Sequence, residues 1–191
     1  MQLGKTLHIT NRTQWRKWLA KNYNKEKEIW LIYNRKSSGK PRIPYNDAVE
    51  EALCYGWIDS TAKSLDEERF AQRFTPRRKN SVLSEMNKER IRMLIKNKKM
   101  TPIGLKSVSH VFDKDKDTQQ EFVISPYILK KIKANKSAWK NFQNFSMSYK
   151  RVRIGYIESQ GKHSDVLFKK SLENFIKKTA KNQKFGMLKD Y

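Results

Sequence analysis

The stretch WIDSTAKSLDEERFAQRFTP, residues 57–76, decides the fold class. Both of its ends carry aromatic and β-branched residues, and the polar run from Ser64 to Glu68 between them is typical of a turn. The pattern predicts two strands joined in a β-hairpin. A further strand is predicted ahead of it, because EIWLIYNRK, residues 28–36, is again aromatic and β-branched.

Helical patterns flank these strands. TNRTQWRKWLAKNY, residues 10–23, opens with Thr and Asn as possible N-caps and places Trp15, Trp18 and Leu19 on one apolar face. The Ser-, Gly- and Pro-containing stretch SSGKPRIPY, residues 37–45, predicts a loop. The first part of the chain therefore begins with a helix, a strand and a loop.

Three more helices are predicted in this part of the chain. One runs from Tyr45 toward Gly56, which ends it as a C-cap glycine does. Ser81 or Ser84 begins the next, and Pro102 stands at the first position of a shorter one. The order helix, strand, helix, hairpin, helix predicts an α+β domain over residues 1–112, with a small antiparallel sheet and packed helices.

The rest of the chain has a different character. DKDKDTQQE, residues 113–121, contains no apolar residue and no period, so we expect an exposed linker there. Residues 122–191 show helical patterns throughout, including an apolar face on the stretch 165–181. They predict an all-helical C-terminal segment packed on the first domain.

The net charge of +23 on 191 residues is extreme. Residues 1–112 hold 24 basic and 11 acidic groups, and residues 113–191 hold 18 and 8, so the excess is spread along the chain. Such a field favours polyanions, nucleic acid among them, as partners. Biased composition on a solvated surface explains the same charge equally well.

The chain shows no signal for membrane insertion or secretion. Its beginning lacks an apolar signal region, and no run of about 18 apolar residues occurs. The single cysteine, Cys54, lies among apolar residues and predicts a buried side chain. We expect a cytoplasmic protein without a membrane span.

Catalytic and metal-binding patterns are absent from the sequence. The three histidines, His8, His110 and His163, are scattered, and no nucleophile elbow or glycine-rich phosphate loop occurs. We therefore expect no metal and no cofactor.

The strongest candidate site is the basic turn after the hairpin. Arg73, Arg77, Arg78 and Lys79 surround a proline and lead into a helix whose first N–H groups are free to bind an anion. A structural alternative pairs these arginines with Asp59 and with the acidic run 66–68, so that salt bridges hold the hairpin to the helix. In that alternative Ser81 or Ser84 only caps the helix.

Several motifs resemble a known family. They are IWLIYNRKSSGKP (29–41), PYNDAVEEALCYGWIDS (44–60), RFTPRRKNSVLSEMNKERIRMLIKNKKMTPIGL (73–105) and FSMSYKRVRIGYIES (145–159). In this order they resemble the YdeI/OmpD-associated family, also called bacteriocin-protection proteins. The resemblance implies a small bacterial protein of the YjbR/CyaY-like α+β class, associated with stress survival and resistance to cationic antimicrobial peptides. It implies no known reaction.

The resemblance extends the candidate anion-binding set by position. The set is Asp59, Arg73, Thr75, Arg77, Arg78, Ser81, Ser84 and Asn87. Two departures are visible: Leu83 replaces a tryptophan of the family pattern, and SQGKHSDV, residues 159–166, keeps only Lys162 of its closing motif.

The sequence thus favours a non-enzymatic protein that binds an anionic small molecule or nucleic acid. One alternative is an enzyme for a small phosphorylated or carboxylated substrate, with Asp59 as base and with Arg73 and Arg77 as clamps. Another is a nucleic-acid-binding or protein-interaction module.

Overall fold

The computed structural model describes residues 3–119 and 121–186. It divides the chain into two compact units, residues 1–82 with 91–114 and residues 83–90 with 115–191. The ends of the predicted domains at residues 1–2 and 187–191, and residue 120 of the predicted linker, lie outside the described residues. The packing of the helical segment on the first domain stays a prediction.

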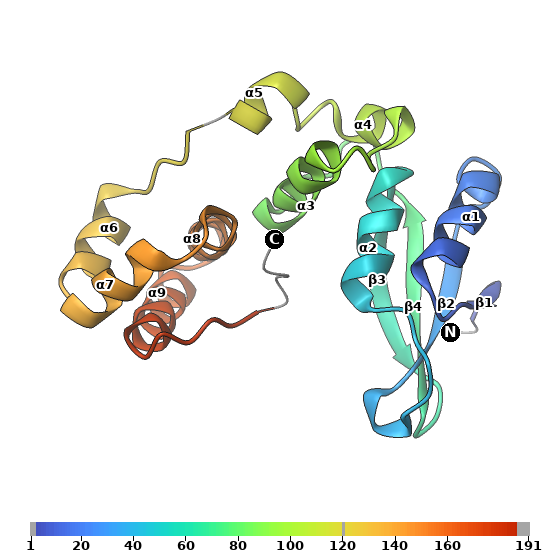
Figure 1. The fold of residues 1–191 in the computed structure, drawn as a ribbon, viewed down its shortest axis with the longest axis horizontal. Coiled ribbons are helices and arrows are strands. Elements are labelled where there is room, and N and C mark those ends of the chain that lie inside the picture. The colour runs from blue at the N-terminus through green and yellow to red at the C-terminus, as the bar shows by residue number, and fades with distance from the viewer. Residues whose placement is uncertain (1–2, 120, 187–191) are drawn as a thin grey trace. The chain divides into compact units, whose positions relative to one another are not determined.

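The first unit contains a sheet in the order β1-β2-β4-β3 (Figure 1). Its strands are β1 (Thr6–His8), β2 (Ile29–Asn34), β3 (Trp57–Ser64) and β4 (Arg69–Pro76). The α+β class is confirmed, but the sheet is mixed and not purely antiparallel, because β1 runs parallel to β2. Strand β1 was not predicted, because its three residues are too few to show an alternating pattern.

The β3–β4 hairpin is confirmed, and its turn lies where the sequence placed it. The Asp66 carboxylate accepts hydrogen bonds from the backbone N–H groups of Glu68, at 2.9 Å, and Arg69, at 2.7 Å. An aspartate in this role stabilises a tight turn by replacing a backbone acceptor. The ladder is irregular between Asp59 and Ala62, so β3 bends where its exposed half begins.

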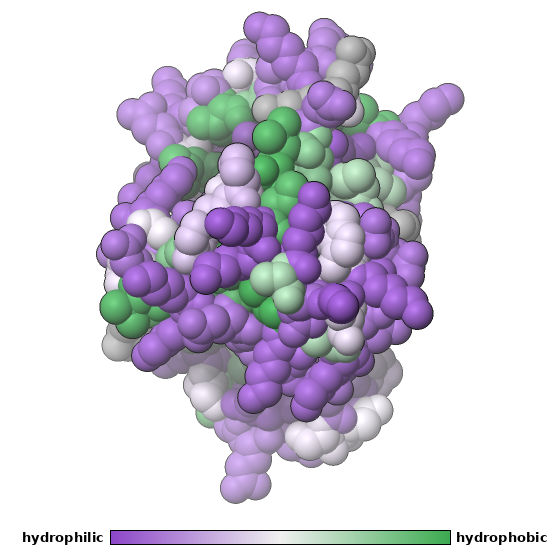
Figure 2. Space-filling view, turned by 90° about the vertical axis from the view of Figure 1, so that its left-hand side faces the viewer, coloured by the Kyte–Doolittle hydropathy of each residue, from purple (hydrophilic) through white to green (hydrophobic). Residues whose placement is uncertain are grey.

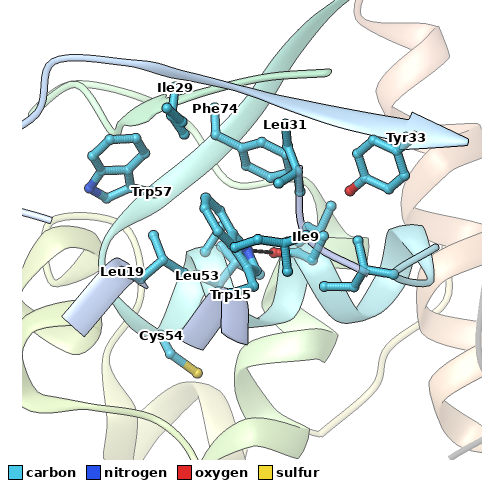
Figure 3. Packing of buried hydrophobic residues seen from close by; sticks show 14 of the residues in the cluster. Ile9, Trp15, Leu19, Ile29, Leu31, Tyr33, Leu53, Cys54, Trp57 and Phe74 are labelled. Carbon is cyan, nitrogen blue, oxygen red and sulfur yellow. Dashed lines mark hydrogen bonds between the residues drawn. The ribbon is translucent and has the colours of Figure 1, made fainter. Parts of the chain in front are cut away.

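The first unit also contains helices. They include α1 (Arg12–Asn22), η1 (Lys36–Ser38), α2 (Tyr45–Cys54) and α4 (Pro102–Val108). The Asn11 side chain caps α1 by accepting from Gln14 N at 2.9 Å. Trp15 enters the core (Figure 3) and donates from its indole to the Ala48 carbonyl at 2.9 Å. The core therefore joins α1 and α2 as well as the sheet.

A cluster of ion pairs also joins α1 to α2. Arg12 contacts Asp47 at 3.2 Å, Glu50 at 2.8 Å and Glu51 at 2.5 Å, and Arg16 contacts Glu51 at 2.6 Å. The Glu51 side chain is only 2% exposed. Burial lowers the pKa of both arginines, but the hydrogen bonds and charge of Glu51 outweigh it, so each pKa is raised.

Helix α3 (Glu85–Lys96) begins after Ser84, whose Oγ accepts from Asn87 N at 3.3 Å. Of the two serines that the sequence offered as the start, Ser84 is therefore the cap. The first residues of α3 group with the second unit and its last residues with the first.

The second unit is helical. Its further elements are α5 (Lys114–Gln119), α6 (Pro126–Lys133), α7 (Lys136–Asn144), α8 (Met147–Gly161) and α9 (Asp165–Ala180). Asn135, Ser146 and Ser164 cap the last three of these helices. The apolar faces of α6 to α9 share one core, with Ile128, Phe142, Tyr149, Ile154, Leu172 and Phe175 among its members.

The segment predicted as an exposed linker is partly helical. Helix α5 occupies six of its residues, and Asp115 and Asp117 lie in its first turn, where negative charge is favourable. The Asp117 carboxylate lies 3.5 Å from the Lys88 ammonium, within the same unit.

Hydrophilic side chains cover most of the face shown in Figure 2, with hydrophobic groups between them. Among the described helices, none combines the length and the apolar character that crossing a bilayer requires.

Candidate anion-binding site

The eight predicted site residues come from different places in the fold. Asp59 lies on β3, and Arg73 and Thr75 lie on β4. Arg77, Arg78 and Ser81 lie in the loop that follows β4, which we call the β4 loop, residues 77–82. Ser84 and Asn87, at the start of α3, belong to the second unit.

Asp59 accepts a hydrogen bond from a tyrosine, and no arginine of the described residues forms a salt bridge with it. The Tyr45 hydroxyl donates to Asp59 Oδ2 at 2.5 Å. Asp59 is paired with Phe74 in the ladder, so both side chains lie on the face that carries the helices. Arg73 and Thr75, on either side of Phe74, lie on the opposite face because side chains alternate along a strand.

Arg73 is bound by Glu28, which was not among the predicted partners. Its Nε and Nη2 donate to Glu28 Oε2 at 2.8 and 2.5 Å. These hydrogen bonds lower the pKa of Glu28, against the opposing effect of burial. Arg73 thus ties β4 to the residue that precedes β2.

Two acidic residues of the hairpin turn form ion pairs with residues outside the β4 loop. Asp66 pairs with Arg69 at 2.7 Å, and Glu68 pairs with Lys40 at 2.5 Å. Neither of these ion pairs holds an arginine of the β4 loop.

Arg77 folds back on its own loop. Its Nη2 donates to the Val82 carbonyl at 2.8 Å, and its backbone N–H donates to the Gly56 carbonyl at 2.8 Å. Its Nε is buried and has no hydrogen-bond partner among the described residues. Burial lowers the pKa of this arginine, and no carboxylate in the described part of the chain forms a salt bridge with it.

Ser81 supplies a second unused polar group in the β4 loop. Its Oγ is buried and has no partner among the described residues. The Ser81 carbonyl accepts a hydrogen bond from His110 Nε2 at 3.0 Å. The side chains of Arg78 and Lys79 are exposed beside them. The loop therefore combines a half-buried guanidinium, a buried hydroxyl and two exposed cations.

The side chains of Ser84 and Asn87, at the start of α3, form hydrogen bonds within the second unit. Ser84 caps the helix, and the Asn87 side chain accepts from Arg90 Nη1 at 2.8 Å. Both side chains therefore have a structural role in the helix start.

The cysteine thiol and the potential metal ligands carry no candidate site in the described part of the chain. Cys54 is buried, as the sequence predicted, and burial raises the pKa of its thiol to about 11, so it stays protonated near neutral pH. Within residues 3–119 and 121–186, no three His, Cys, Asp or Glu side chains form a group that could hold a metal ion.

The β4 loop lies inside a region that comparison with protein families identifies. The model of a domain of unknown function, DUF8412, matches residues 7–107, just over half of the chain. The chain belongs to the DUF8412 family. The DUF8412 domain runs from β1 to α4 and contains Asp59, Arg77 and Ser81, but none of α5 to α9.

The resemblance to the YdeI/OmpD-associated family is wrong. The family comparison identifies the DUF8412 domain over residues 7–107, which contain three of the four motifs, and finds no YdeI/OmpD match. Those motifs describe a strand, a helix and a hairpin with a basic turn, an order that unrelated α+β domains share. No curated protein and no solved structure matches the chain.

Proposed function

We propose that the DUF8412 domain of this protein binds a small oxyanion, such as a phosphate group, at the β4 loop. The observation that carries the proposal is the half-buried Arg77 guanidinium, whose Nε has no partner in the described chain. Burying a charge without a counter-ion is unfavourable, and an anion at this place would compensate it.

The neighbouring groups support the same ligand. Ser81 Oγ can donate a hydrogen bond, and guanidinium and hydroxyl groups are typical donors to phosphate. Arg78 and Lys79 add positive charge at the surface, and the net charge of +23 raises the local concentration of anions.

Binding is better supported than catalysis. The enzyme alternative needs Asp59, Arg73 and Arg77 at one place, but Asp59 is bound by Tyr45 and Arg73 by Glu28 on the opposite face of the sheet. We therefore propose a cytoplasmic binding protein that works without a cofactor.

The test is a titration of the ¹⁵N-labelled protein with inorganic phosphate at constant ionic strength. Amide shifts should concentrate on residues 77–82 and on His110. Ser81→Ala should weaken this binding by about 10- to 150-fold, since a hydrogen bond to a charged group contributes about 1.5–3 kcal/mol. Ser37→Ala, at an exposed serine far along the sequence, is the matched control and should bind as the parent does.

Two results would contradict the proposal. One is an absence of shifts in the β4 loop at millimolar phosphate. The other combines two observations. Ser81→Ala leaves binding unchanged, and the affinity for a duplex oligonucleotide falls steeply as salt rises, with a log–log slope near −0.9 per phosphate contact. That second pattern would support general attraction of nucleic acid by the basic surface.

A further inference from the structure

The second unit contains a pocket between α8 and α9 that lies outside the DUF8412 domain. Its volume is about 390 Å³, within the range of small-molecule sites. Arg153 and Tyr156 from α8, Lys170, Ser171 and Asn174 from α9, and Phe185 after α9 contribute to its lining. All of these residues belong to one unit.

Arg153 is the central group of this pocket. The residue is only 8% exposed, and its Nε is buried without a hydrogen-bond partner among the described residues. The guanidinium carbon lies 3.8 Å from the centre of the Phe185 ring and 5.2 Å from that of Tyr156. Burial lowers the pKa of Arg153, and no carboxylate in the described part of the chain forms a salt bridge with it.

The aromatic contacts hold the guanidinium but do not replace a hydrogen-bond acceptor. Ring contacts use the face of the guanidinium or its charge, whereas its N–H groups lie in its plane and need oxygen acceptors. A buried donor without an acceptor costs about 1–3 kcal/mol. An oxyanion in the pocket would supply the acceptor.

The lining of the pocket indicates the charge of the ligand. Two cations, Arg153 and Lys170, face it together with hydroxyl and amide groups, and no aspartate or glutamate is among its described lining residues. Two positive charges match a dianion better than a single carboxylate. A phosphate monoester carries between −1.5 and −2 charges near neutral pH.

The outer part of the pocket indicates the body of the ligand. Tyr156 is 46% exposed and Leu167 is 44% exposed, so both offer apolar surface. We propose that this pocket binds a small organic phosphate monoester, with the phosphate on Arg153 and Lys170 and an apolar or aromatic group on Tyr156 and Leu167. This site is separate from the one proposed in the β4 loop.

The test is calorimetric titration of the full chain with phenyl phosphate, benzoate and phenol. Phenyl phosphate should bind more tightly than benzoate, which has one charge, and phenol should not bind measurably. Lys170→Gln should weaken phenyl phosphate binding by about tenfold or more, because it removes a charge-assisted contact. Lys169→Gln, at the exposed neighbour outside the described lining, is the control and should leave the affinity unchanged.

Further variants separate this site from the β4 loop and from a folding defect. Arg153→Gln should abolish binding at the pocket, and circular dichroism establishes whether this variant is folded. If Arg153→Gln does not fold, Lys170→Gln still tests the proposal. Ser81→Ala should leave phenyl phosphate binding at the pocket intact. The proposal is overturned if the parent does not bind phenyl phosphate at millimolar concentration, or if Lys169→Gln weakens binding as much as Lys170→Gln.

Discussion

The Tyr45 hydroxyl donates to the Asp59 carboxylate at 2.5 Å and thereby joins the start of α2 to β3. Both side chains are half-buried. The sequence offered Asp59 as a catalytic base or as the partner of Arg77, whereas this contact gives it a structural role. Its energetic contribution can be measured by removing the hydroxyl alone.

We expect Tyr45→Phe to lower the free energy of unfolding by about 1.5–3 kcal/mol, the range for hydrogen bonds to charged groups. Chemical denaturation at neutral pH measures this loss. Tyr127→Phe, at a tyrosine 47% exposed, is the control and should change stability by less than about 0.5 kcal/mol. Equal effects of the two variants would show that the Tyr45–Asp59 bond contributes no stability.

Glu51 should be the most sensitive acidic residue of the α1–α2 cluster. Glu51→Gln leaves Arg12 and Arg16 without their most buried partner, and we expect a loss of about 3 kcal/mol, the low end for a broken buried pair because both arginines are partly exposed. Glu68→Gln breaks an exposed pair with Lys40 and should cost less than about 1 kcal/mol. Denaturant midpoints of both variants test this order, and a larger effect of Glu68→Gln would refute it.

The Arg73–Glu28 pair should make stability depend on pH in the acid range. Arg73 lowers the pKa of Glu28 below its usual 4.5, so the pair stabilises the fold fully above that pH and loses its effect as pH falls through the lowered pKa. Arg73→Gln should therefore be destabilising at pH 7, by up to about 1 kcal/mol, and this effect should shrink as the pH falls below 4.5.

Melting curves between pH 2 and pH 7 measure this dependence. Arg78→Gln, at an exposed arginine, should follow the parent at every pH. If the effect of Arg73→Gln does not decline anywhere between pH 7 and pH 2, then packing of the side chain and not its charge explains it.

The two neighbouring arginines of the β4 loop should differ in stability. Arg77→Ala removes the hydrogen bond to Val82 but also removes a poorly compensated buried charge, so we expect a net loss of about 1 kcal/mol. Arg78→Ala should stay within about 0.5 kcal/mol of the parent. A loss of 3 kcal/mol or more in Arg77→Ala would point to a carboxylate partner, and a larger effect of Arg78→Ala would reverse the assignment.

Local patterns predicted most of the elements because their causes lie within a few residues. Asn11 caps α1, Ser84 caps α3 and Thr101 caps α4, as short-range preferences for caps require. Strand β1 and helix α5 were missed because three residues, or a polar run, carry no hydrophobic period.

The site chemistry was less predictable because its partners are distant in sequence. Glu28 meets Arg73 across 45 positions, and His110 meets Ser81 across 29. No local pattern identifies such pairs, since sheet register and loop packing decide them. Arg153 was not predicted as a site residue for a related reason. The sequence alone does not distinguish a buried arginine of a helix from an exposed one.

Gly56 follows α2 and has a φ of +72°, in the left-handed region that favours glycine. A Cβ at this position would lie 2.8 Å from Ser107 Cβ, a distance that requires α4 or the turn to shift. Gly39 has a similar φ of +65°, but a Cβ there would meet no atom within 4 Å. The two glycines therefore separate backbone strain from steric clash.

Gly39→Ala should cost about 1–2 kcal/mol, the strain of a left-handed conformation for an L-residue. Gly56→Ala should cost about 1–3 kcal/mol more, the range for overpacking. Ser107→Gly removes the atoms nearest to the added methyl group. In a double-mutant cycle of unfolding free energies, Gly56→Ala should therefore cost less in the Ser107→Gly background than in the parent. Equal losses for Gly39→Ala and Gly56→Ala, with no coupling to Ser107, would show that the turn accommodates a methyl group and that only the backbone conformation requires glycine.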